Sequence, residues 1–126
     1  MAVLTLNLFG LIRKYKKIGL DVYLTEVDFG RKKVPWTPEL AEKQKQEYKK
    51  IMTVALKEGV DQVHFWGLKD NDENWRRDEN PLLYDENLNP KPAYYGVKEA
   101  LSEYLAQNKG KAKVDKNVKK EKKVKK

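Results

Sequence analysis

Two carboxylates stand close together near the end of a predicted strand, in the stretch "DVYLTEVDF" at residues 21–29. Val22 and Leu24 are apolar, and Glu26 and Asp28 continue the same spacing of two, which predicts that all four side chains share one face. A carboxylate at such a place can attack an anomeric carbon and stabilise an oxocarbenium-like transition state. The residues alone are equally compatible with an end-of-strand ion pair at Glu26 and a turn cap at Asp28.

A second group of candidates follows the next apolar run, "VDQVHFWGL" at residues 60–68. Trp66 ends this run, and Asp70, Trp75 and Arg76 come soon after it. Functional groups of parallel α/β folds gather at the carboxyl ends of the strands, so we expect this group to lie near the two acids. An indole ring offers a flat apolar surface for the face of a sugar ring. The tryptophans are also compatible with core or lid positions, and the arginine with a solvated pair.

The elements that must position these side chains alternate along the chain. Residues 4–18 have apolar side chains at helical spacing, and Gly19 follows as a C-terminal cap. Residues 37–59 predict a second helix, with Thr37 as its N-cap. A last helix is expected from about residue 92 to 107. The order helix–strand–helix–strand–helix favours an α/β fold with parallel strands.

The predicted sheet is small for the length of the chain. Two strands leave both sheet edges open, and they give a thin core to a body of about 108 residues. The pattern therefore indicates part of a larger sheet. We expect residues 1–108 to form this body.

The net charge of +8 belongs to the C-terminal segment "KGKAKVDKNVKKEKKVKK", residues 109–126. This segment holds ten of the 27 basic and two of the 19 acidic residues, which leaves 17 of each in the body. It has no aromatic residue and few apolar ones, so we expect it to be disordered. Binding of a polyanion by this segment is an alternative, but the aromatic residues that stack on nucleic-acid bases are absent, which argues against nucleic acid as a partner.

Composition excludes several classes of function. The chain has no cysteine and one histidine, so it predicts neither a disulfide nor a metal centre, and no motif predicts a cofactor. No apolar run approaches the roughly 20 residues that span a bilayer, and we expect no membrane partner. The opening "MAVLTLNLFGLI" has no basic residue before Arg13 and no cleavage motif, so it does not read as a signal peptide.

Three ordered motifs resemble the C-terminal part of glycoside hydrolase family 10, whose xylanases fold as a (β/α)8 barrel. The family's T-E-L-D motif is similar to residues 25–28, "TEVD". Its F-W-G-x-x-D and S-W motif is similar to "FWGLKDNDENW" at residues 65–75. Its P-L-L-F-D and K-P-A-Y segments are similar to residues 81–94. The resemblance covers about residues 8–106 and implies a partial TIM barrel that comprises strands 7 and 8 with their flanking helices.

The resemblance also implies roles for the candidates. Glu26 would be the nucleophile of a retaining endo-β-1,4-xylanase, and Trp66 and Trp75 would line the sugar subsite beside the cleavage point. Supporting positions around them are implied for Asp28, Asp70 and Arg76. The substrate would be xylan or a related β-1,4-linked polysaccharide. The location would be extracellular, as is usual in the family.

The same resemblance implies that one catalytic group is not among these residues. A retaining glycosidase needs a second carboxyl group about 5–5.5 Å from the nucleophile. In the family this acid belongs to an Asn-Glu pair at the end of strand 4, and no strand before Glu26 carries such a pair. Glu73 and Glu79 lie in the loop after the second strand and do not match that position. Two other positions depart from the family pattern, namely His64 for a small hydroxyl residue and Asn74 for serine.

We therefore expect the chain alone not to hydrolyse xylan, and we expect the N-terminal part of the barrel to be a partner. A non-catalytic carbohydrate-binding remnant is the alternative that belongs to another class of function. Polyanion binding by the lysine-rich segment is a further alternative.

Overall fold

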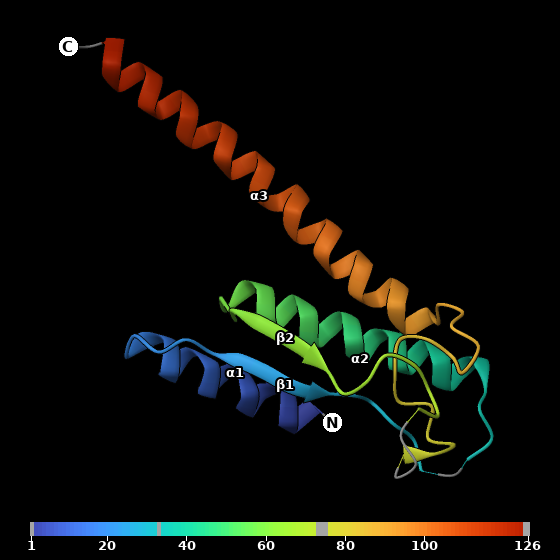
Figure 1. Ribbon diagram of the computed structural model, residues 1–126. Coiled ribbons are helices and arrows are strands. Elements are labelled where there is room, and N and C mark those ends of the chain that lie inside the picture. Colours follow the sequence, from blue (N-terminus) through green and yellow to red (C-terminus); the bar gives the residue numbers. More distant parts are fainter. Residues whose placement is uncertain (1, 33, 73–75, 125–126) are drawn as a thin grey trace.

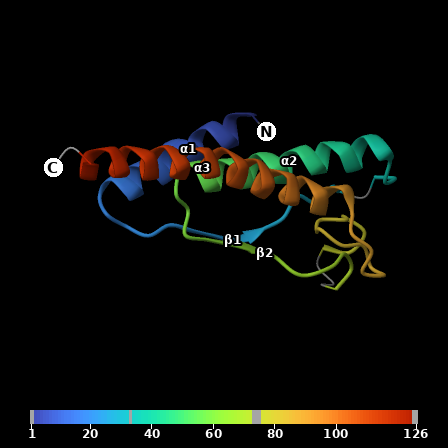
Figure 2. The same ribbon diagram turned by 90° about the horizontal axis from the view of Figure 1, so that it is seen from above.

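The computed structural model describes residues 2–32, 34–72 and 76–124. It confirms the predicted order of elements: α1 (Ala2–Lys17), β1 (Tyr23–Val27), α2 (Pro38–Lys57), β2 (Gln62–Phe65) and α3 (Pro92–Val124). β1 and β2 are parallel neighbours, so the expected α/β class is also confirmed. Figure 2 shows the three helices together on one side of the two strands. Among the described residues, no helix is long and apolar enough to cross a membrane.

The register of the two strands changes at one point. Tyr23 lies opposite Gln62 and Leu24 opposite Val63, but the next aligned pair is Val27 with Phe65. β1 therefore contains one residue more than β2 over this interval, which is the definition of a β-bulge.

Because of the bulge, the side chains of β1 do not alternate between the two faces of the sheet in the regular way that the sequence predicts. Leu24, Val27 and Phe29 all pack against the helix-side core cluster, so the residues that face the helices change from even to odd numbers. Glu26 adopts a left-handed backbone conformation with φ 59° at this point. The prediction that Glu26 and Asp28 share the face of Leu24 is therefore wrong, because the extra residue reverses which side chains point to the core.

The core lies between α2 and the sheet. Ile51 and Met52 of α2 form a buried cluster with Ala100 of α3, and side chains of both strands pack against it. The buried face of α2 comprises Ala41, Gln44, Tyr48, Ile51, Met52, Val54 and Ala55. The hydroxyl of Thr37 accepts a hydrogen bond from the backbone N–H of Leu40 at 3.2 Å, which confirms its predicted capping role.

α3 packs closely on α2 at its N-terminal half. A Cβ atom at Gly96 would lie 2.5 Å from the backbone oxygen of Lys45, so the close approach of the two helices requires glycine there. Lys45 and Lys49 both form ion pairs with Glu99, and Lys49 also pairs with Glu103. These contacts fix the first four turns of α3 against α2.

α3 continues to Val124, so it does not end near residue 107 as the sequence predicts. Lysine and alanine are good helix formers, and the segment contains no proline that would stop the helix. In Figure 1 this end of α3 extends away from the other elements. A helix that extends away from the rest of a fold gains little tertiary stabilisation there, so disorder of residues 109–126 in solution stays a prediction, as does polyanion binding by them.

We predict that the backbone amides of residues 109–124 exchange with solvent at close to unfolded-chain rates, because this part of the helix extends away from the other elements and is free to fray. The amides around Ile51 and Met52 in α2 serve as the internal control and should be strongly protected. Hydrogen exchange followed by NMR measures both sets in one sample. Equal protection of the two sets would contradict the prediction.

Candidate active site

The carboxyl ends of β1 and β2 lie side by side. The backbone N–H of Trp66 donates to the oxygen of Val27 at 3.0 Å, so the end of β2 is joined to the residue directly after Glu26. A tryptophan and a carboxylate are thus brought to one edge of the sheet, as the sequence predicts.

Glu26 occupies the strained position of the bulge. Its φ of 59° lies in the left-handed region, which costs a non-glycine residue about 1–2 kcal/mol. Its side chain is exposed, and within the described ranges no hydrogen bond or ion pair engages its carboxylate. The alternative interpretation, an acid paired with a lysine, therefore finds no partner in this part of the chain. A bulge of this kind is a common way to re-aim a side chain beside an active site.

Asp28 is held by an arginine from the loop that follows β2. Its carboxylate lies 3.1 Å from the guanidinium of Arg76, whose other terminal nitrogen lies 2.9 Å from Glu79. The Asp28 side chain is only 8% exposed. Burial raises the pKa of Asp28 above its usual value, while the charge of Arg76 and a hydrogen bond from the Gly30 backbone act in the opposite direction.

Gly30 leaves space for the ion pair between Arg76 and Glu79. A Cβ atom at this position would lie 2.6 Å from Nη1 of Arg76 and 2.8 Å from Oε2 of Glu79. Any other residue would displace the pair. Because Glu79 is occupied by Arg76, it is not placed as a free second acid for Glu26, and Glu73 lies outside the described residues.

The loop after β2 runs beside the extension of β1. The N–H of Phe29 donates to Pro81 at 3.2 Å, and the N–H of Arg31 donates to Glu79 at 2.8 Å. These two backbone hydrogen bonds bring the loop and its arginine against the chain that follows Glu26.

Asp70 does not join this group at the edge. It is 2% exposed and lies 2.7 Å from the ammonium of Lys91, and its other oxygen accepts from the N–H of Leu82 at 2.8 Å. Burial raises the pKa of Asp70 and lowers the pKa of Lys91, and the attraction within the pair opposes both shifts. Asp70 therefore forms buried contacts within the loop, and its implied supporting role in the site stays a prediction.

Trp66 presents an accessible aromatic surface. Trp66 is 40% exposed, and its neighbour Gly67 has a φ of 115°, a left-handed conformation that favours glycine. His64 is also exposed, and its Nε2 lies 2.8 Å from the side-chain oxygen of Gln62 on the same strand. His64 is therefore not a core residue here. Trp75, the second predicted sugar-binding residue, lies outside the described residues.

The sequence did not reveal the contacts that Gln44, Tyr48 and Trp36 make beside the site. Gln44 and Tyr48 of α2 are fully buried and bond the loop, and Trp36 lies 5.0 Å from the ammonium of Lys91. Gln44 could have been found as a polar residue within the apolar stripe of α2.

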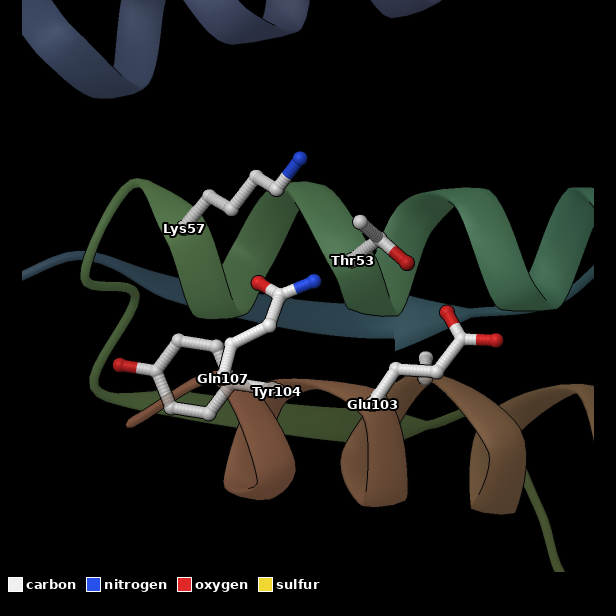
Figure 3. Close-up of a pocket in the computed structure, with 6 residues that line it drawn as sticks. Thr53, Lys57, Glu103, Tyr104 and Gln107 are labelled. Atoms are coloured by element: carbon white, nitrogen blue, oxygen red, sulfur yellow. The ribbon is translucent and has the colours of Figure 1, made fainter. Parts of the chain in front are cut away.

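A separate pocket lies between α2 and α3. Figure 3 shows Lys57 and Thr53 of α2 opposite Glu103, Tyr104 and Gln107 of α3. Lys57 ends α2, so this pocket is near the start of β2, at the opposite end of the strands from Glu26. It plays no part in the site at the strand ends. No group of three or more potential metal ligands occurs in the described part of the chain.

These observations define a parallel α/β unit with its candidate site at the carboxyl ends of the strands. Residues 5–100 match the family model described as glycosyl hydrolase family 10, and the chain belongs to this family.

Individual relatives agree with this assignment. Endo-1,4-beta-xylanase B of Thermotoga neapolitana is 30% identical over 100 residues, which cover 75% of this chain and 29% of that protein. The crystal structure of xylanase 10B from Thermotoga petrophila in complex with xylobiose is similar with a TM-score of 0.69 and 31% identity. That match covers 75% of this chain and 31% of the other. The chain thus spans about a third of the length of these relatives.

We predict that Glu26→Gly raises the free energy of unfolding by about 1 kcal/mol, because glycine adopts the left-handed conformation without steric cost. Glu26→Gln should leave stability nearly unchanged, since it keeps the Cβ atom. Asp21→Gly, an exposed position just before β1, is the matched control and should not raise stability. Urea denaturation measures all three variants, and a loss of stability in Glu26→Gly would contradict the assigned strain.

We predict that Arg76→Gln raises the pKa of Asp28 further, because the cation that favours the ionised carboxylate is removed. Carboxyl ¹³C NMR titration measures this pKa directly. A carboxyl whose pKa is raised in the folded state stabilises the fold most at low pH, and this contribution is lost as the pH rises through the folded pKa. In the variant this loss should begin at the same pH, which the unfolded-state pKa sets, but it should be larger and extend to a higher pH. Arg77→Gln is the adjacent control, and an equal effect of both variants would refute a specific contact.

Proposed function

We propose that this chain supplies strands 7 and 8 of a family 10 glycosidase barrel and carries the nucleophile of a retaining β-1,4-xylanase. The observation that carries the proposal is the exposed carboxylate of Glu26, which pairs with no other described residue and which a strained bulge places beside Trp66 at the strand ends. Family membership and the xylanase relatives support xylan or a related polysaccharide as the substrate.

The proposed chemistry assigns one step to Glu26. Its carboxylate attacks the anomeric carbon and forms a glycosyl-enzyme ester as the bond to the leaving sugar oxygen breaks. Asp28 and Arg76 hold the backbone after the nucleophile, and Trp66 with Trp75 provides the sugar-stacking surface. A second carboxyl group must protonate the leaving oxygen and later activate water. Among the residues that the structure describes, Glu79 is paired with Arg76 and no other acid is assigned to this role, so we propose that hydrolysis requires the remaining strands of a barrel.

The open sheet is consistent with such a completion. The helices lie on one side of β1 and β2, and on the other side Tyr23, Thr25, His64 and Trp66 are exposed. In a closed barrel this face would be interior. We therefore propose that the partner of this surface is the N-terminal part of a family 10 barrel.

A chimeric enzyme tests whether Glu26 acts as the nucleophile. Residues 5–100 replace the matched segment of the Thermotoga neapolitana xylanase, and release of reducing sugar from xylan is measured together with circular dichroism. The chimera should be active, and Glu26→Gln should lower kcat by at least about 10⁴-fold, because the covalent step is lost. Glu86→Gln, on an exposed loop, is the matched control.

The 126-residue chain assayed alone should release no sugar. A folded chimera that keeps its activity in Glu26→Gln would contradict the proposed nucleophile. Hydrolysis by the isolated chain would contradict the requirement for further strands.

Sugar binding without catalysis is a second candidate, favoured by the 40% exposure of Trp66. We predict that Trp66→Ala removes retardation of the chain in a xylan-containing gel, because the stacking surface is lost. Tyr95→Ala, which removes a comparably exposed aromatic residue on α3, should migrate as the wild type does. Equal mobility of wild type and Trp66→Ala would remove this candidate.

A further inference from the structure

Three consecutive residues of the loop after β2 are fixed by buried side chains from elsewhere in the fold. The oxygen of Asn80 accepts from Gln44 at 2.5 Å and from the ammonium of Lys91 at 2.9 Å. The oxygen of Pro81 accepts from the hydroxyl of Tyr48 at 2.5 Å. The N–H of Leu82 donates to Asp70, the partner of Lys91. We call Gln44, Tyr48, Asp70 and Lys91 the loop anchor.

The loop anchor consists of buried polar and charged side chains, whose removal from water costs folding free energy. Gln44 and Tyr48 are fully buried, and Asp70 and Lys91 are 2% and 7% exposed. Buried polar and charged groups are seldom more stabilising than well-packed apolar ones, but they select one conformation because each alternative leaves a group unpaired. Such a set is suited to fixing the exact course of a loop.

The loop anchor is connected to the candidate nucleophile by short steps. Gln44 also donates to the oxygen of Phe29 at 3.0 Å, so one side chain holds both the loop and the strand extension. Pro81 and Glu79 accept the N–H groups of Phe29 and Arg31, and Arg76 of the same loop pairs with Asp28. The chain immediately after Glu26 is therefore held from the loop side.

From these contacts we propose that the loop anchor consists of positioning residues, which keep the bulge at Glu26 in its strained conformation by fixing Asp28 and Phe29 from the loop side. A left-handed glutamate persists only where its surroundings impose it, and this network imposes it on the C-terminal side of the bulge. The claim about position rests on geometry alone. Its relevance to catalysis rests on the proposed role of Glu26 as nucleophile.

The test compares local with global effects in the intact chain. Tyr48→Phe removes only the hydroxyl group, and Gln44→Leu removes both amide hydrogen bonds. Ile51→Val shortens a core side chain that does not bond the loop and is the matched control. Hydrogen exchange is measured at Phe29, Arg31 and Trp66, and at Asp61, whose N–H donates to Val22 at the other end of the strands.

Tyr48→Phe and Gln44→Leu should each speed exchange at Phe29, Arg31 and Trp66 by about fivefold or more relative to Asp61, as the loss of one net hydrogen bond predicts. The pKa of Asp28 should also rise in both variants as Arg76 moves away. Ile51→Val should change all four amides alike and leave this pKa unchanged. Uniform changes in all three variants, or an unmoved Asp28, would overturn the proposal.

These readouts require no activity, so they stand apart from the chimera experiment. In an active chimera, Tyr48→Phe should lower kcat and leave KM nearly unchanged, since the sugar-stacking tryptophan is not part of the loop anchor. If the chimera fails while the exchange pattern holds, the proposed function is wrong and the positioning role remains. If exchange is uniform while the chimera is active, the positioning role is wrong.

Discussion

The β-bulge at Glu26 is the constraint on which the arrangement of the site depends. One additional residue in β1 changes which side chains face the helices, so Leu24 packs on the core before the bulge and Val27 and Phe29 after it. Without the additional residue, the two acids would point to the apolar core, and both Val27 and Phe29 would lose their burial. The bulge thus allows one short strand both to close the core and to present a carboxylate at its end.

The loop after β2 acts on this bulge through polar contacts. Arg76 neutralises the partly buried Asp28, and backbone hydrogen bonds join residues 29–31 to residues 79–81. The α2 helix contributes as well, because Gln44 and Tyr48 reach the loop from the same buried face that packs on the sheet. The same face of α2 therefore packs on the core and holds the loop beside the site.

Much of the fold follows from local sequence signals. The Thr37 cap, the apolar stripe of α2 and the alternation of helices with strands all predict elements that the structure confirms, and the spacing of Glu26 and Trp66 predicts that they meet at the strand ends. The bulge was not predictable, because a glutamate in the left-handed conformation carries no glycine or asparagine signal. The end of α3 was missed because lysine favours helix and gives no stop signal. The role of Lys91 was hidden because its partner Asp70 lies 21 residues away.

Glu26, as the proposed nucleophile, needs the rest of a barrel to act. A retaining mechanism passes through a covalent ester between the sugar and the nucleophile, and a 2-deoxy-2-fluoro xylobioside with a good leaving group traps that ester without help from an acid. Mass spectrometry of the labelled, digested chimera identifies the modified carboxylate directly. If Glu26 is the nucleophile, we expect a single adduct of the fluorinated sugar on the peptide that contains Glu26. An adduct on any other carboxylate would contradict it.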